Sequence, residues 1–548
     1  SVAPTDVLNT LGSLVDKSLV TAAPTPAGEM RYRLLETVRE YAQERLCAAP
    51  DAADAAAARH LTHYRELARA ADPQLRGSAQ RAALDRLQLE HDNLRVALRR
   101  AIATRDEHEA LSLVHSLMWF WTLLDLRPEA RAWSLAAAGL GPNPFVPTPD
   151  PAPPVYEGCV DVPPPYPDEL LQEARRGVRL IALSTAEGDM RALSDPATQA
   201  ELRGVVAAYH PGLPQTCRLP GFMWFYAGII TGQFTSMFEI FDTAVRTCRE
   251  LGREWELAFA LQLRAKVLND QPGGLEPSAA DAAESLEIFE RLGDGWGMAE
   301  SLATRGEARE RYGEHEAAAR DYEQAIAYTE ALGAHAQIPM IAARLGGALI
   351  EMGRAEEGER LLRDALADAD RAATEARHFT RMQLAVFCAR TGRTDEALEH
   401  FHQLEEGFAS GGGPELFKAL VQGFLGWVDV IDGRNAEALP RIRRAVTGTH
   451  NDPMAQLVAP NITVTQFVVA GWALAGLDRA ADGARLLGAY DALSQEPSHA
   501  LGVERENRER AGAAVRAAFP AGSAGEAAYQ RAYEEGRELT LEQAIRLV

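Results

Sequence analysis

Lysine is scarce in this sequence, with three among 548 residues, at positions 17, 266 and 418. A Walker A loop needs a Gly-Lys-Ser/Thr step at the start of a helix, because backbone N–H groups cradle the phosphates while the Lys neutralises them. Here Asp16, Ala265 and Phe417 precede the three lysines. The chain therefore has no P-loop, and we expect no ATP, ADP or other cofactor to bind within it.

Catalytic and metal-binding patterns are missing too. The sequence has no GxSxG or HExxH motif, and its five dispersed cysteines include no CxxC pair, which fits a reducing compartment better than a disulfide framework. His60 and His63 lie three apart on an expected helix, but a surface or packing role is favoured because no third ligand is near. His400 and His402, two apart, would point to different helix faces. We predict no catalytic site, no metal site and no enzyme.

Long apolar runs and an excess of positive charge are also absent. The most apolar stretch, Phe222–Ile230, is too short to span a bilayer, and the N-terminus does not resemble a signal peptide. A net charge of −22 and a pI near 5.1 repel nucleic-acid phosphates and anionic lipids. We expect a cytoplasmic protein that binds neither nucleic acid nor membranes directly.

The sequence does contain an internal repeat. Its turn position is marked by glycines spaced 40, 39 and 41 residues apart: Gly313, Gly353, Gly392 and Gly433. A small residue stands seven before each (Gly306, Gly346, Ala385, Gly426) and five after each (Ala318, Gly358, Ala397, Ala438). A larger apolar residue stands nine after each: Tyr322, Leu362, Phe401 and Ile442. This period, with helix-forming sequence on both sides of the Gly, predicts a solenoid of helical hairpins.

Each unit has a simple physical interpretation. Helix A ends at the Gly, which adopts a left-handed conformation, and the small residues let helix B approach helix A closely. The larger residue is expected to fill the next hairpin. Weaker copies centred on Gly232, Gly273 and Gly476 extend the series to about seven hairpins. At Gly476 the pattern blurs, because Arg485 takes the larger apolar position.

The N-terminal region has a different pattern. Residues 8–20 (LNTLGSLVDKSLV) show helical spacing that ends in a strand-like step, and a Pro/Gly turn and the strand-like Met30–Leu34 follow. An amphipathic helix is predicted over Leu35–Leu46, with its apolar face formed by Leu35, Val38, Tyr41, Ala42 and Leu46. Helix, hairpin and helix form the second half of a winged helix. The predicted fold class is therefore all-α: a tetratricopeptide-like helical-hairpin superhelix of period about 40 with a partial winged helix at the N-terminus.

Four segments together resemble a known junction. LVDKSLV, RYRLLETVREYAQERL, RHLTHYRELA (59–68) and LEHDNLRVALRRAI (89–102) are similar to the link between the winged helix of an NB-ARC/STAND ATPase and its helical-repeat sensor. That arrangement belongs to large actinobacterial transcriptional regulators of the SARP and ATP-binding LuxR types. GARLLGAYDAL (483–493) and EGRELTLEQA (535–544) resemble the end of the same sensor. The resemblance implies junction positions at Asp16, Lys17, Arg39, Tyr41, Glu90, Asp92 and Asn93. A second interpretation makes Asp92 or Asn93 the cap of a helix starting at Leu94.

The ATPase and DNA-binding portions of such regulators have no counterpart in this sequence. We therefore expect a fragment of a longer regulator rather than a stand-alone remnant. The resemblance implies a sensor and autoinhibitory arm that relays effector or partner binding to an intramolecular ATPase module, which would bind ATP or ADP upstream. The alternative is a free-standing tetratricopeptide-like scaffold that binds a peptide or protein.

A protein or small-molecule effector is expected in the concave groove lined by the A helices. Exposed positions counted from the repeats include Arg311, Met340, Phe379, Arg390 and Trp427. Arg, Met and aromatic side chains suit a peptide or an amphipathic effector. For Met340 and Phe379, ordinary packing between repeats is an equal alternative.

The predicted organisation has five parts. They are the half winged helix (1–48), a helical linker with a first hairpin (49–140), a Pro-rich insertion (141–168), the repeat array (169–490) and C-terminal capping helices (491–548). The insertion is too rich in Pro for helix or sheet, so polyproline II or disorder is expected there, acting as a hinge or as a docking segment around Pro163–Tyr166. Before it, an aromatic-rich hairpin with Trp119, Phe120, Trp121 and Trp133 is predicted to be core.

Overall fold

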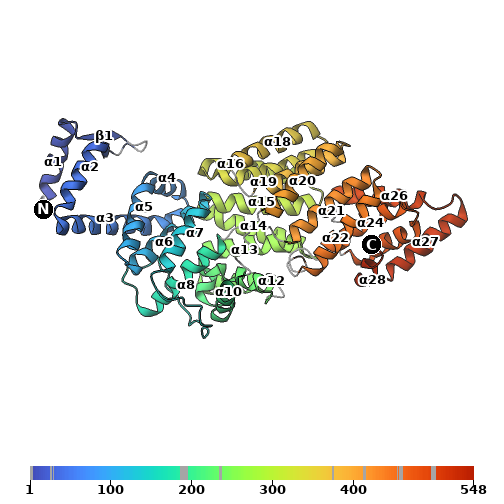
Figure 1. Cartoon of the computed structure of the whole chain (residues 1–548), viewed down its shortest axis with the longest axis horizontal. Helices are drawn as coiled ribbons and strands as arrows, with labels where there is room; N and C mark the ends of the chain where they lie inside the picture. The colour runs from blue at the N-terminus through green and yellow to red at the C-terminus, as the bar shows by residue number, and fades with distance from the viewer. Residues whose placement is uncertain are drawn as a thin grey trace.

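The computed structural model describes residues 4–24, 28, 30–185, 195–233, 237–372, 376–410, 415–452, 455, 461–494 and 502–548. Within these ranges the regular secondary structure is helical apart from one two-stranded sheet, which confirms the all-α fold class (Figure 1). None of the helices in these ranges is long and apolar enough to cross a lipid bilayer.

The N-terminal unit lies at one end of the molecule and is joined to the rest through a long helix (Figure 1). It consists of α1 (Pro4–Asp16), β1 (Val20–Pro24), β2 (Met30–Leu34) and α2 (Glu36–Cys47). The strands are antiparallel and pair Val20 with Leu34 and Pro24 with Met30, so the predicted helix, hairpin and helix are confirmed. Among the described residues of this unit only Val20 is buried, and α2 buries none. Of the apolar face predicted for α2, the described residues cover Val38 and Leu46 only in part and leave Leu35 and Tyr41 exposed.

A helical segment follows the N-terminal unit. Its elements are α3 (Pro50–Ala71), η1 (Asp72–Leu75), α4 (Gln80–Leu89), α5 (His91–Ala103), α6 (Glu107–Leu123), α7 (Arg127–Ala138) and α8 (Asp168–Ser184). Next come α10 (Pro196–Ala208), η2 (Pro214–Cys217), η3 (Gly221–Met223) and α11 (Trp224–Ile230). The predicted aromatic hairpin is α6 with α7, and Trp119, Phe120 and Trp121 are buried as expected for core.

The repeat array begins with α11 and α12 (Met237–Leu251) and continues as consecutive helix pairs. The A helices are α13 (Glu254–Asn269), α15 (Gly295–Arg311), α17 (Ile338–Glu351, after η4, His335–Gln337), α19 (Ala376–Arg390), α21 (Glu415–Ile431) and α24 (Ile462–Ala475). The B helices are α14 (Leu275–Leu292), α16 (His315–Leu332), α18 (Ala355–Ala372), α20 (Thr394–Ser410), α22 (Asn435–Asn451) and α25 (Ala480–Leu493). The C-terminal helices are α26 (Gly502–Ala517), α27 (Ser523–Arg537) and α28 (Leu541–Ile545).

The predicted turn glycines have the expected conformation at all but one position. Their φ angles are positive, between 66° and 82°, at Gly232, Gly273, Gly313, Gly353, Gly392 and Gly433. Gly476 is the exception, with a φ of −74°, and Asp478 takes the left-handed turn instead with a φ of 58°. Short polar Asp tolerates this conformation better than most residues. Counted from Asp478, the last hairpin fits the pattern fully.

The corrected count explains why the last repeat looks irregular in sequence. Gly471 then stands seven before the turn, Gly483 five after it and Leu487 nine after it. Leu487 is fully buried, so it rather than Arg485 occupies the larger apolar position. A Cβ placed on Gly483 would lie 2.7 Å from the carbonyl oxygen of Gly471, which shows how closely the two helices approach.

The same close approach occurs in the central hairpins. A Cβ placed on Gly358 would lie 2.5 Å from the carbonyl oxygen of Gly346, and one on Gly346 would lie 3.0 Å from Leu362. Likewise, a Cβ on Gly306 would lie 2.6 Å from the ring of Tyr322. The larger residue therefore packs inside its own hairpin, over the small residue of helix A. The expected packing on the next hairpin is confirmed for Phe401, whose ring stacks on Phe424 of α21 at a centroid distance of 5.2 Å.

The Pro-rich insertion is packed against the helices. It has no regular helix or strand, as expected, but Phe145, Val155 and Tyr166 are buried in the same core as α6 and α8. The backbone N–H of Ala152 donates to the carbonyl of Ala208, and the Tyr166 hydroxyl donates to the carbonyl of Cys159. Residues 141–167, which we call the strap, are therefore neither a hinge nor a free docking segment in this structure.

An aromatic cluster joins the helical segment to the array. The ring of Trp119 on α6 lies edge-on to Trp255 and Trp296, at centroid distances of 5.2 and 4.8 Å. Asp294, which is buried, accepts hydrogen bonds from the indole of Trp255 and from the side chain of Gln80 on α4. Segments more than 200 residues apart in sequence are thereby fixed together.

We predict that Gly358→Ala destabilises the array. The added methyl group would meet the carbonyl of Gly346 on a facing backbone that cannot move without separating the two helices, so we expect a loss of about 1–3 kcal/mol. Gly347→Ala is the matched control, because its methyl group would meet nothing closer than 3.8 Å. There the higher helix propensity of Ala should leave stability unchanged or raise it by up to about 1 kcal/mol. Urea denaturation followed by circular dichroism measures both, and equal midpoints would contradict the prediction.

Candidate functional site

A cavity of about 380 Å³ lies between the A helices and the helical segment. One wall comes from α13, α15 and α17, and the facing wall comes from α6, α8 and the α6–α7 turn. Because the segment before the array turns back to face the A helices, a predicted open groove becomes a walled pocket at this end.

The walls carry exposed apolar side chains. Met340 on α17 is 38% exposed and Tyr226 on α11 is 40% exposed, which is unusual for large apolar residues in this chain. Met118, Met223 and Ile341 extend the same lining. Met side chains are flexible and polarizable, so a Met-rich lining adapts to different apolar partners.

The charged side chains of this cavity are paired with each other. The Lys266 ammonium lies 2.6 Å from a Glu300 carboxylate oxygen, and the Arg344 guanidinium lies 3.0 Å from Glu307. Burial lowers the pKa of Lys266, but the charges of Glu300 and Glu307 outweigh it and hold that pKa above its usual value. Asp125 is paired with Arg127 at 2.8 Å. An occupant therefore needs no net charge to match the cavity.

One buried acceptor in the cavity wall is unsatisfied. The side-chain oxygen of Gln337 has no hydrogen-bond partner among the described residues. Unsatisfied buried polar groups are costly, so this oxygen favours an occupant that donates a hydrogen bond. Apolar walls, balanced charge and one free acceptor together suit a peptide backbone with an apolar side chain.

A polar network lies beside the cavity, on α15 and α16. The Tyr322 hydroxyl donates to the Glu310 carboxylate at 2.8 Å. Burial raises the pKa of Glu310 to about 7, although Arg344 and this hydrogen bond act to lower it. Glu310 thus exchanges its proton near neutral pH.

The structure separates the five predicted groove residues. Met340 lines the cavity, and Phe379 is half-buried beneath the Arg344 guanidinium, 4.9 Å from its ring centroid. Arg311 is paired with Asp270, the residue directly after α13. Arg390 and Trp427 lie further along the array, away from this cavity.

Helix α26 covers the A helices at the C-terminal end of the array. Glu506 of α26 accepts from Arg390 at 2.9 Å, and Asn507 accepts from the Trp427 indole at 2.8 Å. Trp427 is only 3% exposed, so its predicted role as an exposed groove residue is wrong. Arg390 also pairs with Glu351 at the end of α17, and so it bridges α17, α19 and α26.

The predicted junction residues come together only in part. Glu90 accepts from Arg31 of β2 at 2.8 Å, from the Tyr64 hydroxyl and from the side chain of Asn93, and thereby ties the N-terminal unit to α3 and α5. Helix α5 begins at His91 rather than Leu94, and Asp92 and Asn93 lie within its first turn, so neither is its cap. The other four junction residues are exposed: Asp16, Lys17, Arg39 and Tyr41.

Sequence reasoning missed the paired charges of the cavity. Lys266, Glu307 and Arg344 lie on successive A helices, whereas the predicted groove includes only one or two positions of each repeat. A usable signal was present, because Glu300 and Met340 both stand thirteen residues before a turn glycine. This shared repeat position predicts that Glu300 and Met340 lie on the same face of the array. Within the described ranges no three His, Cys, Asp or Glu side chains are grouped to hold a metal ion, and His60 and His63 instead pack against Tyr64.

We predict that Arg390→Met loosens α26. Removing the guanidinium leaves Glu351 and Glu506 facing each other without the cation between them, and we expect a loss of about 1–2 kcal/mol. Limited proteolysis should then cut within 502–517 sooner than in the wild type. Arg371→Met is the control, since Arg371 and its partner Asp368 are both well exposed. An unchanged cleavage rate for Arg390→Met would contradict the bridging role.

Glu310 predicts a pH dependence. The folded chain keeps the Glu310 proton up to about pH 7, whereas the unfolded chain loses it near pH 4.5. The protonated Glu310 therefore contributes its full share to the free energy of unfolding below pH 4.5, and that share disappears as the pH rises through 7. Glu310→Gln should abolish that part of the decline, up to about 3 kcal/mol, in denaturation midpoints between pH 5 and 8. The exposed Glu290→Gln serves as control and should keep the wild-type profile. Parallel profiles for wild type and Glu310→Gln would refute the assignment.

Comparison with known proteins adds information mainly at the N-terminus. Residues 2–47 match the winged helix-turn-helix domain family, which confirms a winged-helix element there. Curated relatives from Mycobacterium bovis and Mycobacterium tuberculosis, provisionally named HTH-type transcriptional regulators, are 42% identical over 119 residues. Those matches cover 22% of this chain and 13% of each relative. The crystal structure of a Rap protein complexed with competence and sporulation factor aligns with 75% of this chain and 99% of its own, at 12% identity and a TM-score of 0.40. The chain thus carries a match to the winged helix-turn-helix domain family at residues 2–47 and is similar over 119 residues to proteins named as HTH-type transcriptional regulators.

Proposed function

We propose that this chain is the sensor and protein-interaction arm of a transcriptional regulator, and that it performs no catalysis itself. The observation that carries the proposal is the cavity beside Met340 and Tyr226, where exposed apolar side chains and balanced ion pairs form a site for an uncharged ligand. The winged-helix match at residues 2–47 supports the regulatory setting. Repeat arrays present such surfaces to partners rather than to reactants.

The N-terminal unit is proposed to dock on a protein module rather than on DNA. Residues 1–48 hold six acidic and five basic side chains, a net charge of −1, which gives no electrostatic attraction to phosphate. Leu8, Met30, Leu35 and Tyr41 are each about half exposed or more. Such a concentration of exposed apolar side chains marks an interaction surface. In the proposed regulator that surface contacts an ATPase module that binds ATP or ADP. A ligand on the array then changes the relative populations of the two conformational states of that module.

Peptide display tests the sensor site. We expect the immobilised chain to select short peptides with uncharged apolar side chains, and we expect Met340→Asp to weaken their binding at least about tenfold by placing an unpaired charge in the lining. Phe238→Asp is the matched control, because Phe238 is equally exposed but lies outside the cavity. Selected peptides that bind Met340→Asp as well as the wild type would overturn the site assignment.

The relay is tested separately in the coding sequence. We expect an in-frame GxxxxGK[ST] loop ahead of Ser1 and, in the complete product, ATP turnover that changes when a selected peptide is added. If no such loop is encoded, the free-standing scaffold becomes the better account of the same cavity.

A further inference from the structure

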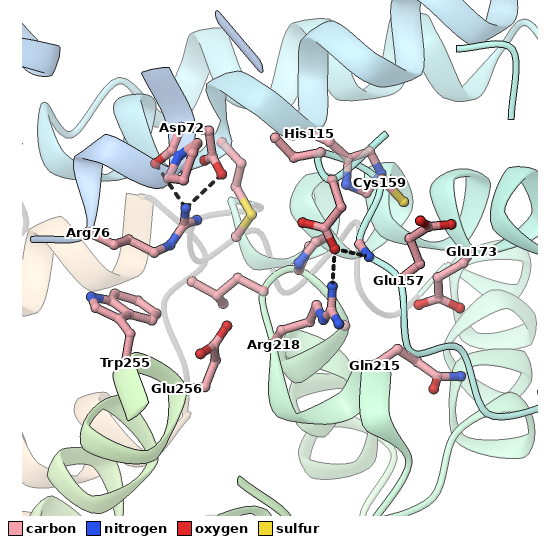
Figure 2. Close-up of a pocket in the computed structure, with 18 residues that line it drawn as sticks. Asp72, Arg76, His115, Glu157, Cys159, Glu173, Gln215, Arg218, Trp255 and Glu256 are labelled. Carbon is pink, nitrogen blue, oxygen red and sulfur yellow. Dashed lines mark hydrogen bonds and ion pairs between the residues drawn. The ribbon is translucent and has the colours of Figure 1, made fainter. Parts of the chain in front are cut away.

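A second cavity, of about 220 Å³, lies under the strap (Figure 2). Its lining shares Met118 with the cavity beside Met340, which we call the sensor cavity. Its walls come from η1, α6, α8, α13, the η2–η3 turn and strap residues 157–161. Glu157 and Asp161 of the strap are exposed, which marks the side open to solvent. We call it the strap cavity. Its size suits several waters or one small molecule.

The strap cavity holds more carboxylates than cations. Its lining includes Asp72, Glu157, Asp161, Glu173 and Glu256 against Arg76 and Arg218. Two further guanidiniums lie close by, Arg176 beside Glu173 and Arg253 beside Glu256. His115 adds no charge at neutral pH, because burial lowers its pKa to about 4 while its Nε2 is bonded to the Ala174 carbonyl. The site therefore holds five carboxyl groups against four guanidiniums, and burial raises the pKa of two of those carboxyls, Glu173 and Asp72.

The two lining guanidiniums already have partners. Arg76 donates to the carboxylate and carbonyl of Asp72, and its guanidinium lies over the ring of Trp255 (Figure 2). Arg218 donates to Asp161 and to the carbonyl of Tyr156. An anionic ligand would therefore have to displace existing ion pairs. The described residues also form no cluster that could hold a metal ion.

Two buried polar atoms in the lining have no partner among the described residues. Asp72, only 6% exposed, has a free Oδ1, and Arg218 has a free Nε. Glu256 makes no hydrogen bond to another described side chain. Burial raises the pKa of Asp72, and the negative charges of Asp161 and Glu256 raise it further, while Arg76 acts to lower it. The cavity thus offers a free hydrogen-bond acceptor, Asp72 Oδ1, and a free hydrogen-bond donor, the Nε–H of Arg218.

We propose that the strap cavity binds a small organic cation of net charge +1 that also carries a hydrogen-bond acceptor, the chemistry of a basic amino acid. The positive group balances the excess carboxylate between Asp72 and Glu256, and the acceptor takes the free N–H of Arg218. The site borders the sensor cavity at Met118, but the other residues of the two linings differ. Its ligand would fix the strap, whose Tyr156 carbonyl accepts from Arg218 of the η2–η3 turn and from Arg253 at the start of α13.

Calorimetric titration of the full chain with L-arginine and L-citrulline tests the proposal. Citrulline keeps the shape of arginine but replaces the guanidinium with an uncharged urea group. We expect L-arginine to bind with a dissociation constant below about 1 mM and L-citrulline to bind at least about tenfold more weakly. Undetectable binding of L-arginine, or equal binding of the two, would overturn the proposal.

Variants then locate the site. Glu256→Gln should weaken L-arginine binding about tenfold, and Glu157→Gln on the exposed strap should weaken it less, about threefold. Glu437→Gln, an exposed position on α22, is the control and should bind as the wild type does. Circular dichroism melting establishes that each variant is folded. L-arginine binding that is unchanged in both Glu256→Gln and Glu157→Gln would place the ligand elsewhere and refute the strap site.

Discussion

The packing of Trp119 against Trp255 and Trp296 is the contact on which both cavities depend. It brings α6 and its neighbours back against the A helices, so that each cavity has walls from segments far apart in sequence. Buried aromatic pairs of this kind combine a large apolar area with a preferred edge-to-face geometry. Arg76 adds a cation over two of the rings, 5.6 Å from Trp119 and 5.2 Å from Trp255. Without this cluster the array would present an open face, as solenoids usually do.

The local parts of the fold could be predicted from the sequence because they depend on local chemistry. Turn glycines and small residues recur at a fixed period, and the β2 strand was predicted with its observed ends. The error at Gly476 arose because Asp478, two residues later, adopts the left-handed conformation instead. The strap was harder. Its Pro content correctly excludes regular structure, but nothing in its composition indicates that Phe145 and Tyr166 bury themselves among α6 and α8.

A site residue could be predicted only where its place on its own repeat helix determines whether its side chain is exposed. Met340 was found because it projects from its own helix, and it lines the cavity. Trp427 was misplaced because its burial depends on α26, which lies 80 residues further along the chain. The ion pairs of Lys266 and Arg344 each join two helices, so no single repeat reveals them. The strap cavity has walls from several segments that are far apart in sequence, so no local sequence pattern indicates it.

Asp294 has a consequence for how the helical segment recognises its place on the array. Successive hairpins offer nearly the same surface, so a docked segment could slip by one unit with little penalty. A second set of turn glycines, Gly252, Gly293 and Gly333, lies between one hairpin and the next. The residues one and three after these glycines are Arg253 and Trp255, then Asp294 and Trp296, then Ala334 and Ala336. Only the middle hairpin combines a carboxylate with an indole, and Gln80 bonds both the Asp294 side chain and the Trp296 backbone. The Asp294 carboxylate thus determines which hairpin of the repetitive array the helical segment packs against.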